Sequence, residues 1–108
     1  NLAKVGDLTF QQEALDSEST VVVDFFAEWC GPCLMLGPVI EKLTTEYNGR
    51  LKFVKLNVDE DPVTPNRYSI RGIPTMIVFR GGEEAHRIVR FLPEERLRQE
   101  FEGQLQPT

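Results

Sequence analysis

The chain has 108 residues, of which 41% are hydrophobic and 27% charged, as is usual for a globular protein. This length suits one modest core, so we expect a single domain over residues 1–108. A net charge of -5 argues against a nucleic-acid-binding protein, which needs basic side chains to neutralise phosphates. No apolar run approaches the roughly 20 residues that span a bilayer, and two cysteines are too few for a disulfide-rich secreted scaffold. We expect a cytoplasmic monomer that binds neither nucleic acid nor membrane; the first residue, Asn1, leaves open an organellar location or a place in a longer chain.

The start of the chain predicts a helix between two strands. Residues 2–5 are a short strand, and Asp7 is a suitable N-cap for a helix through Leu8 and the apolar residues after it. Residues 20–26 are β-branched or aromatic, with one aspartate among them. Such a run indicates a central strand that is buried on both faces.

A crossover helix and a second strand follow. From residue 33 to residue 47 apolar side chains recur at helical spacing, and we expect Pro38 to kink this helix about one turn in. Residues 51–58 are the next strand, parallel to the first because a helix connects the two. A short helix over residues 61–68 comes after it.

The last third of the chain predicts a hairpin and a final helix. Residues 72–74 are a break, residues 75–79 and 84–89 are antiparallel strands joined by a turn at 80–83, and Pro93 opens the helix. The whole order indicates an α/β fold with a central mixed sheet of about five strands and about four helices. A parallel βαβ half precedes an antiparallel ββα half.

The only two cysteines lie in Trp29-Cys30-Gly31-Pro32-Cys33, between the strand and the crossover helix. The thiolate is the reactive form of cysteine, and the free N–H groups of a helix N-terminus stabilise an anion. Cys30, at the cap, gains most, whereas we expect Cys33, one turn inward, to be more covered. The spacing therefore predicts that Cys30 attacks a substrate disulfide and that Cys33 resolves the mixed disulfide. Gly31 permits close approach of a partner chain, and Pro32 suits the first helical turn.

Three other interpretations of the cysteine pair stay open. A structural disulfide across so short a loop would restrict the unfolded chain by only about 2 kcal/mol. A zinc site needs about four ligands and His86 is the only other soft candidate, so we expect no metal. The pair could also be incidental.

Four separated segments resemble the thioredoxin family, and the resemblance covers nearly the whole chain. They are the active-site strand and helix start at 23–33, the next strand at 55–59, the cis-proline segment at 68–75 and the hairpin turn at 79–83. The resemblance implies a thioredoxin fold and a dithiol–disulfide oxidoreductase that reduces disulfide-containing proteins without a cofactor. It also implies a thioredoxin reductase as the partner that recharges the cysteine pair.

Asp24 is a carboxylate in a strand that otherwise belongs to the core. It is either an outward-facing or hydrogen-bonded polar residue, or a buried acid whose pKa is raised by burial. The resemblance favours the buried acid, which would exchange a proton with Cys33. Lys55 on the neighbouring strand is then its charge partner; the alternative is an ordinary surface lysine.

The resemblance further implies a substrate-binding rim. A cis bond between Ile73 and Pro74 would face the cysteines, where the backbone of Ile73 can pair with an extended substrate. Trp29 lies outside the apolar run, so we expect a partly exposed docking surface there. Two positions depart from the family: Leu34 replaces a usual Lys or Arg, and Arg90 replaces a glycine of the partner groove. Arg90 either shifts partner choice, for example toward acidic partners, or points into solvent without effect.

Two other functions remain compatible with these residues. An oxidase or isomerase domain uses the same chemistry, because the redox poise of a dithiol depends on the relative stability of its two forms. A binding module with a thioredoxin-like fold would not need its cysteines. The intact pair of Cys30 and Cys33 weighs against a purely structural role.

Overall fold

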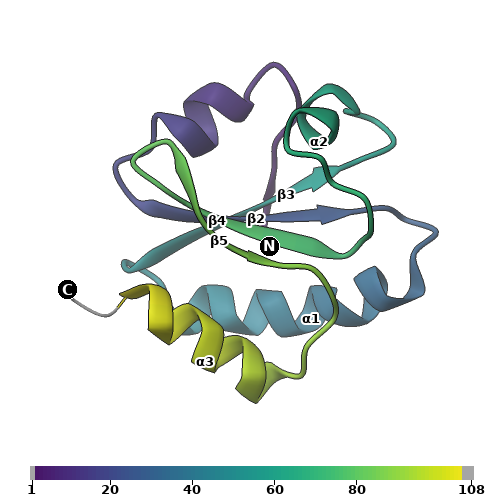
Figure 1. Cartoon of the computed structure of the whole chain (residues 1–108). Helices are drawn as coiled ribbons and strands as arrows, with labels where there is room; N and C mark the ends of the chain where they lie inside the picture. The colour runs from purple at the N-terminus through teal and green to yellow at the C-terminus, as the bar shows by residue number, and fades with distance from the viewer. Residues whose placement is uncertain (1, 106–108) are drawn as a thin grey trace.

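The computed structural model describes residues 2–105, which form a central five-stranded sheet with helices on both faces (Figure 1). In chain order the elements are β1 (Ala3–Lys4), η1 (Gln11–Leu15), β2 (Thr20–Phe26), α1 (Gly31–Glu46), β3 (Leu51–Asn57), α2 (Val63–Arg67), β4 (Thr75–Arg80), β5 (Glu83–Ile88) and α3 (Glu94–Leu105). Helices α1 and α3 cover one face of the sheet, and the short helices η1 and α2 lie on the other. Within the described part of the chain, no helix is long and apolar enough to cross a membrane.

The strand order is β1-β3-β2-β4-β5, with β2 at the centre. Strands β1, β3 and β2 run parallel, whereas β4 is antiparallel to both β2 and β5. Gly81 and Gly82 have φ angles of 61° and 83°, which a tight hairpin turn between β4 and β5 requires. The predicted α/β class, the mixed sheet and the parallel-then-antiparallel order are all confirmed.

Strand β2 is buried on both faces, as its composition predicts, because its side chains alternate between two cores. Val22 packs into the core beneath α1 and α3, and Val21 and Val23 pack into the core beneath η1 and α2. Asp24 has the same parity as Val22 and therefore lies on the face that α1 covers. The central strand thus places a carboxylate below the helix that carries the cysteines.

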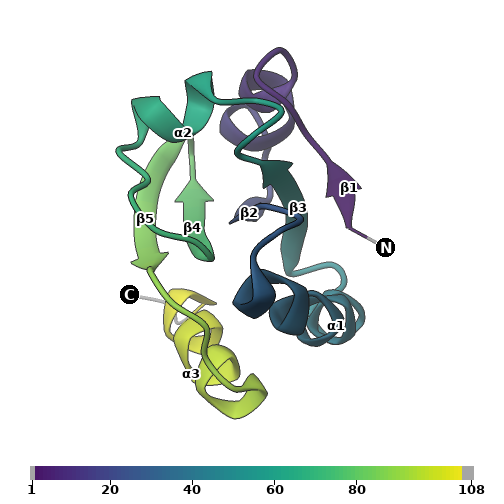
Figure 2. The same cartoon turned by 90° about the vertical axis from the view of Figure 1, so that its right-hand side faces the viewer.

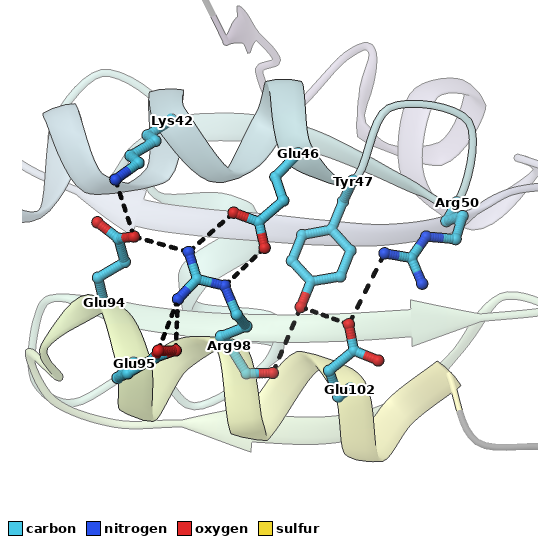
Figure 3. Close-up of polar contacts among 8 residues, drawn as sticks. All are labelled: Lys42, Glu46, Tyr47, Arg50, Glu94, Glu95, Arg98 and Glu102. Carbon is cyan, nitrogen blue, oxygen red and sulfur yellow. Dashed lines mark hydrogen bonds and ion pairs between the residues drawn. The ribbon is translucent and has the colours of Figure 1, made fainter.

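An ion-pair cluster fastens α3 to α1 (Figure 3). The guanidinium of Arg98 on α3 donates to Glu46 on α1 at 2.6 and 2.8 Å, and to Glu94 and Glu95 on its own helix at 2.6 and 2.5 Å. The buried Tyr47 adds a hydroxyl that donates to Glu102 at 2.8 Å. These contacts orient α3 against the helix that carries the cysteines.

Two predictions for the N-terminal segment are wrong. Asp7 does not cap the helix that follows it: η1 begins only at Gln11, and its N-cap residue makes no side-chain hydrogen bond. The carboxylate instead accepts the backbone N–H groups of Val63 at 3.1 Å and Thr64 at 2.7 Å, at the start of α2. Leu8 is 98% exposed, because the loop before η1 turns it away from the core. The free N–H groups at the start of α2 attract the Asp7 carboxylate across the fold.

Candidate active site

The two cysteines form a disulfide at the N-terminus of α1. Cys30 is the N-cap residue, and its sulfur accepts the backbone N–H of Cys33 at 3.2 Å. Pro32 lies in the first turn, where backbone N–H groups have no partner within the helix, so the lack of an N–H costs no hydrogen bond. The expected difference in cover is wrong, since Cys30 and Cys33 are 4% and 5% exposed. Cys30 is covered because Phe26 and Ile73 pack against the small cluster that holds both cysteines.

The loop before β4 reaches the cysteine pair. The Ile73–Pro74 peptide bond is cis, as the resemblance implies. The carbonyl oxygen of Ile73 lies 3.9 Å from the sulfur of Cys30. The hydroxyl of Thr75 donates to the carbonyl of Gly72 at 2.6 Å and so ties the loop to the first residue of the strand.

Trp29 forms an exposed rim beside the cysteines, with 72% of its surface accessible. Its indole Nε1 donates to a carboxylate oxygen of Asp59 at 2.7 Å. Together with Ile73, Arg71 and neighbouring residues it lines a pocket of about 190 Å³. Asp59 was not among the predicted site residues. The pairing of β2 with β3 could have indicated this contact, because residues that follow two parallel neighbouring strands emerge at the same edge of the sheet.

Asp24 is a buried acid, with 6% of its surface exposed. No group among residues 2–105 hydrogen-bonds its Oδ1 atom. The side chain lines a pocket of about 450 Å³ beneath α1, with Gly37, Glu41 and Lys55 among its other walls. Burial raises the pKa of Asp24 from 3.8 to about 7, and the positive charge of Lys55 opposes this rise.

Lys55 is the residue of β3 that pairs in register with Asp24 on β2. Its ammonium nitrogen lies 5.5 Å from the centre of the Phe26 ring. The side chain acts on the pKa of Asp24 through its charge. Lys55 is half-buried and lines the same pocket as the acid.

Arg90 lies in the loop that joins β5 to α3 and is exposed. It lines a separate pocket of about 200 Å³, together with Val89 and Arg96. Figure 2 shows this loop on the side of the molecule where α1 begins and where the loop before β4 passes. Gly31 and Leu34 lie exposed in the first turn of α1. Among the described residues, no three His, Cys, Asp or Glu side chains gather closely enough to hold a metal ion.

Comparison with known proteins agrees with this geometry. The family model described as Thioredoxin matches residues 1–102. Thioredoxin 1 of the cyanobacterium Nostoc sp. is 46% identical over 103 residues, which are 95% of this chain and 96% of that protein. Thioredoxin of Chlorobaculum thiosulfatiphilum is 53% identical over 87 residues, 81% of each chain. Chloroplastic thioredoxin M4 of Arabidopsis thaliana is 43% identical over 98 residues, 91% of this chain and 51% of that protein. The chain therefore belongs to the thioredoxin family, and its Cys30–Cys33 pair makes it a thiol–disulfide oxidoreductase that reduces protein disulfides.

Proposed function

We propose that Cys30 is the attacking nucleophile of this protein-disulfide reductase and that Cys33 is the resolving thiol. The observation that carries this assignment is the 3.2 Å contact from the Cys33 backbone N–H to the Cys30 sulfur. In the reduced protein this N–H, with the partial positive charge of the α1 N-terminus, stabilises a thiolate on Cys30. Cys33 lies one turn inside the helix and has no equivalent cap position.

The reaction then runs in two exchanges. The Cys30 thiolate attacks one sulfur of the substrate disulfide, so that the substrate S–S bond breaks, a mixed disulfide forms, and the first substrate thiolate leaves and takes a proton from solvent. Cys33 gives up its proton and attacks the sulfur of Cys30. The Cys30–Cys33 disulfide forms, the mixed disulfide breaks, and the second substrate thiol is released. The substrate gains two electrons and the cysteine pair loses two.

Asp24 is our proposal for the group that takes the proton from Cys33. A base works best when its pKa lies near the working pH, and burial raises the pKa of Asp24 to about 7. An acid with an ordinary pKa would hold almost no proton at neutral pH, and so could not return one in the reverse reaction. Lys55 tunes this value downward through its charge. We assign Asp24 to proton transfer, and we assign Lys55 to lowering the pKa of Asp24 through its charge.

The substrate-binding rim combines a main-chain contact with an apolar surface. Ile73 offers its backbone beside the cysteines, which suits an extended substrate segment without demanding a particular sequence. Trp29 offers an exposed aromatic face held by Asp59. The residues proposed for substrate binding are Trp29, Gly31, Pro32, Ile73, Pro74 and Arg90.

Trapping with single serine variants tests the division of labour between the cysteines. Reduced Cys33→Ser should accumulate a mixed disulfide with a protein substrate such as insulin, because the resolving thiol is missing. Reduced Cys30→Ser should trap none, and Cys30→Ser/Cys33→Ser is the blank. Trapping by Cys30→Ser and not by Cys33→Ser would reverse the assignment, and equal insulin reduction by the double variant would remove the pair from catalysis.

Family membership implies disulfide-containing protein substrates and a reductase partner in general. We propose further that this reductase is a thioredoxin reductase, and that residues 1–108 act as one monomeric domain in the cytoplasm. Sedimentation of the purified protein tests the monomer. A reductase-coupled insulin assay tests the electron donor, and the absence of turnover with any thioredoxin reductase would refute it.

A further inference from the structure

Three arginines stand apart from the other basic side chains of the chain. Of its 12 Lys and Arg residues, all except Arg71, Arg90 and Arg96 contact a carboxylate, a carbonyl oxygen or an aromatic ring. No ion pair, hydrogen bond or ring contact joins these three to any residue that the structure describes. All three are exposed.

The three unpaired arginines line two pockets of the surface. Arg71 lines the same pocket as Trp29 and Ile73. Arg90 and Arg96 line the neighbouring pocket at the loop between β5 and α3. Figure 2 shows the loop before β4 and the loop after β5 on the side of the molecule where α1 begins. Among residues 2–105, the arginines without a side-chain partner therefore lie on the loop before β4, on the loop after β5 and on α3.

The carboxylates near these pockets form no ion pair with the three arginines. Glu100 lines the pocket of Arg90 and Arg96, but its carboxylate lies 2.5 Å from the Nε2 atom of His86. Asp59 holds the indole of Trp29 rather than Arg71. The three guanidinium groups therefore remain open to carboxylates of another molecule.

We propose that Arg71, Arg90 and Arg96 form a docking surface for an acidic segment next to the target disulfide of a substrate protein. This arginine surface rests on the reductase function proposed above and specifies which substrates it favours. The argument is charge complementarity: a substrate segment rich in Asp or Glu supplies the partners that the protein itself does not. Arginine suits this task because its guanidinium donates in a planar fork that matches a carboxylate.

The expected effect lies in the rate of association. Complementary charges steer encounter at low salt, and the effect fades once the Debye length falls below the separation of the charges. Three exposed charge pairs across several ångströms of water should speed the reaction by roughly three- to tenfold at about 0.02 M salt. At about 0.5 M salt, charges are screened within a few ångströms, so the ratio of the rate constants for an acidic and a neutral substrate should fall below about two.

The test uses two synthetic disulfide-bridged peptides that differ only in their flanks, four Glu residues in one and four Gln residues in the other. Pre-reduced full-length protein is mixed with each peptide, and the second-order rate constant is measured at both salt concentrations. Arg71→Gln/Arg90→Gln/Arg96→Gln should lose the preference for the acidic peptide, so that the ratio of its rate constants for the acidic and the neutral peptide falls to about one. The ratio is the readout because Arg90 also belongs to the proposed binding rim, and reduction of the neutral peptide shows that the cysteines still work.

A second triple variant controls for net charge. Arg50→Gln/Lys52→Gln/Arg80→Gln removes the same number of positive charges from the other end of the sheet, where these side chains contact Glu102, Glu13 and Gln104. It should keep the acidic preference. If the wild type reduces both peptides equally, or if both triple variants lose the preference alike, the arginine surface is refuted while the reductase function stands. If the wild type reduces neither peptide, the reductase function itself fails.

Discussion

Replacement of Asp24 by Asn should stabilise the oxidised protein, and the gain should depend on pH. Burial raises the pKa of Asp24 from 3.8 to about 7, so the folded protein holds a proton that the unfolded chain has already released. The stability that this proton confers is complete below pH 3.8 and is lost as the pH rises to about 7. Asn has almost the same shape and never ionises, so it does not suffer this loss.

The size of the effect follows from the separation of the two pKa values. Each pKa unit is worth about 1.4 kcal/mol, so a rise from 3.8 to about 7 costs the folded state roughly 4 kcal/mol once both states are ionised. Asp24→Asn should therefore match the wild type near pH 3.5, exceed its free energy of unfolding by roughly 1 to 2 kcal/mol at pH 5, and exceed it by roughly 4 kcal/mol at pH 8. Above pH 8 the difference should be constant.

Urea unfolding of the oxidised forms, followed across the pH range, measures this difference directly. The disulfide must stay intact so that the cysteines do not titrate. Lys55 and Glu41 are the charged groups that line the same pocket, and they are present in both proteins. A stability difference that is equal at pH 4 and pH 8 would show that Asp24 is not a buried acid with a raised pKa. The same variant should slow the second exchange at neutral pH, since Cys33 loses its proton acceptor.

Three further changes have defined outcomes. Gly37→Ala should raise the free energy of unfolding by up to about 1 kcal/mol, because no atom within 4 Å meets an added Cβ and glycine is unfavourable inside a helix. Gly103→Ala in α3 is equally open and should give a similar gain. A loss of stability in Gly37→Ala alone would contradict the open geometry. Arg98→Gln should lower the midpoint of thermal unfolding, because it removes the ion pairs between α1 and α3. The difference from the wild type should shrink at high salt, which screens ion pairs. An unchanged midpoint at low salt would show that the cluster does not hold α3. Asp59→Ala removes the hydrogen bond to Trp29 and should raise the KM for a protein disulfide by roughly threefold, the contribution of one exposed hydrogen bond. The kcat for a small disulfide should stay unchanged. The fluorescence of Trp29, the only tryptophan, should change in this variant.

Local patterns were sufficient to predict most of the sheet and the cysteine site. The apolar run at 20–26 identified the central strand, because only a strand packed on both faces tolerates so many β-branched residues. The turn at 80–83 identified the hairpin, because its glycines allow positive φ angles. Cys30 and Cys33 are assigned to a helix start because apolar residues recur at helical spacing from residue 33 onward. Each of these inferences needs only neighbours in the sequence.

Contacts between distant segments could not be predicted in the same way. Asp7 caps α2 across 57 residues, and Trp29 bonds to Asp59 across 30 residues. In both cases the sequence shows a suitable donor or acceptor but not which of several candidates the fold brings within reach. The burial of Cys30 could not be predicted either, because Ile73, which packs against it, lies far along the chain.

The placement of Lys55 explains how the site keeps a proton on Asp24 near neutral pH. A lysine bonded directly to the carboxylate would favour the ionised form and hold its pKa well below 7. Lys55 instead places its ammonium over the ring of Phe26, at 5.5 Å from the ring centre, and acts on Asp24 through charge alone. With no hydrogen bond to Oδ1 from the described residues, burial dominates and Asp24 can both hold and release a proton at neutral pH. In the mechanism proposed here, the burial that lowers stability above pH 4 is also what gives Asp24 a pKa suited to exchanging a proton with Cys33 in both directions.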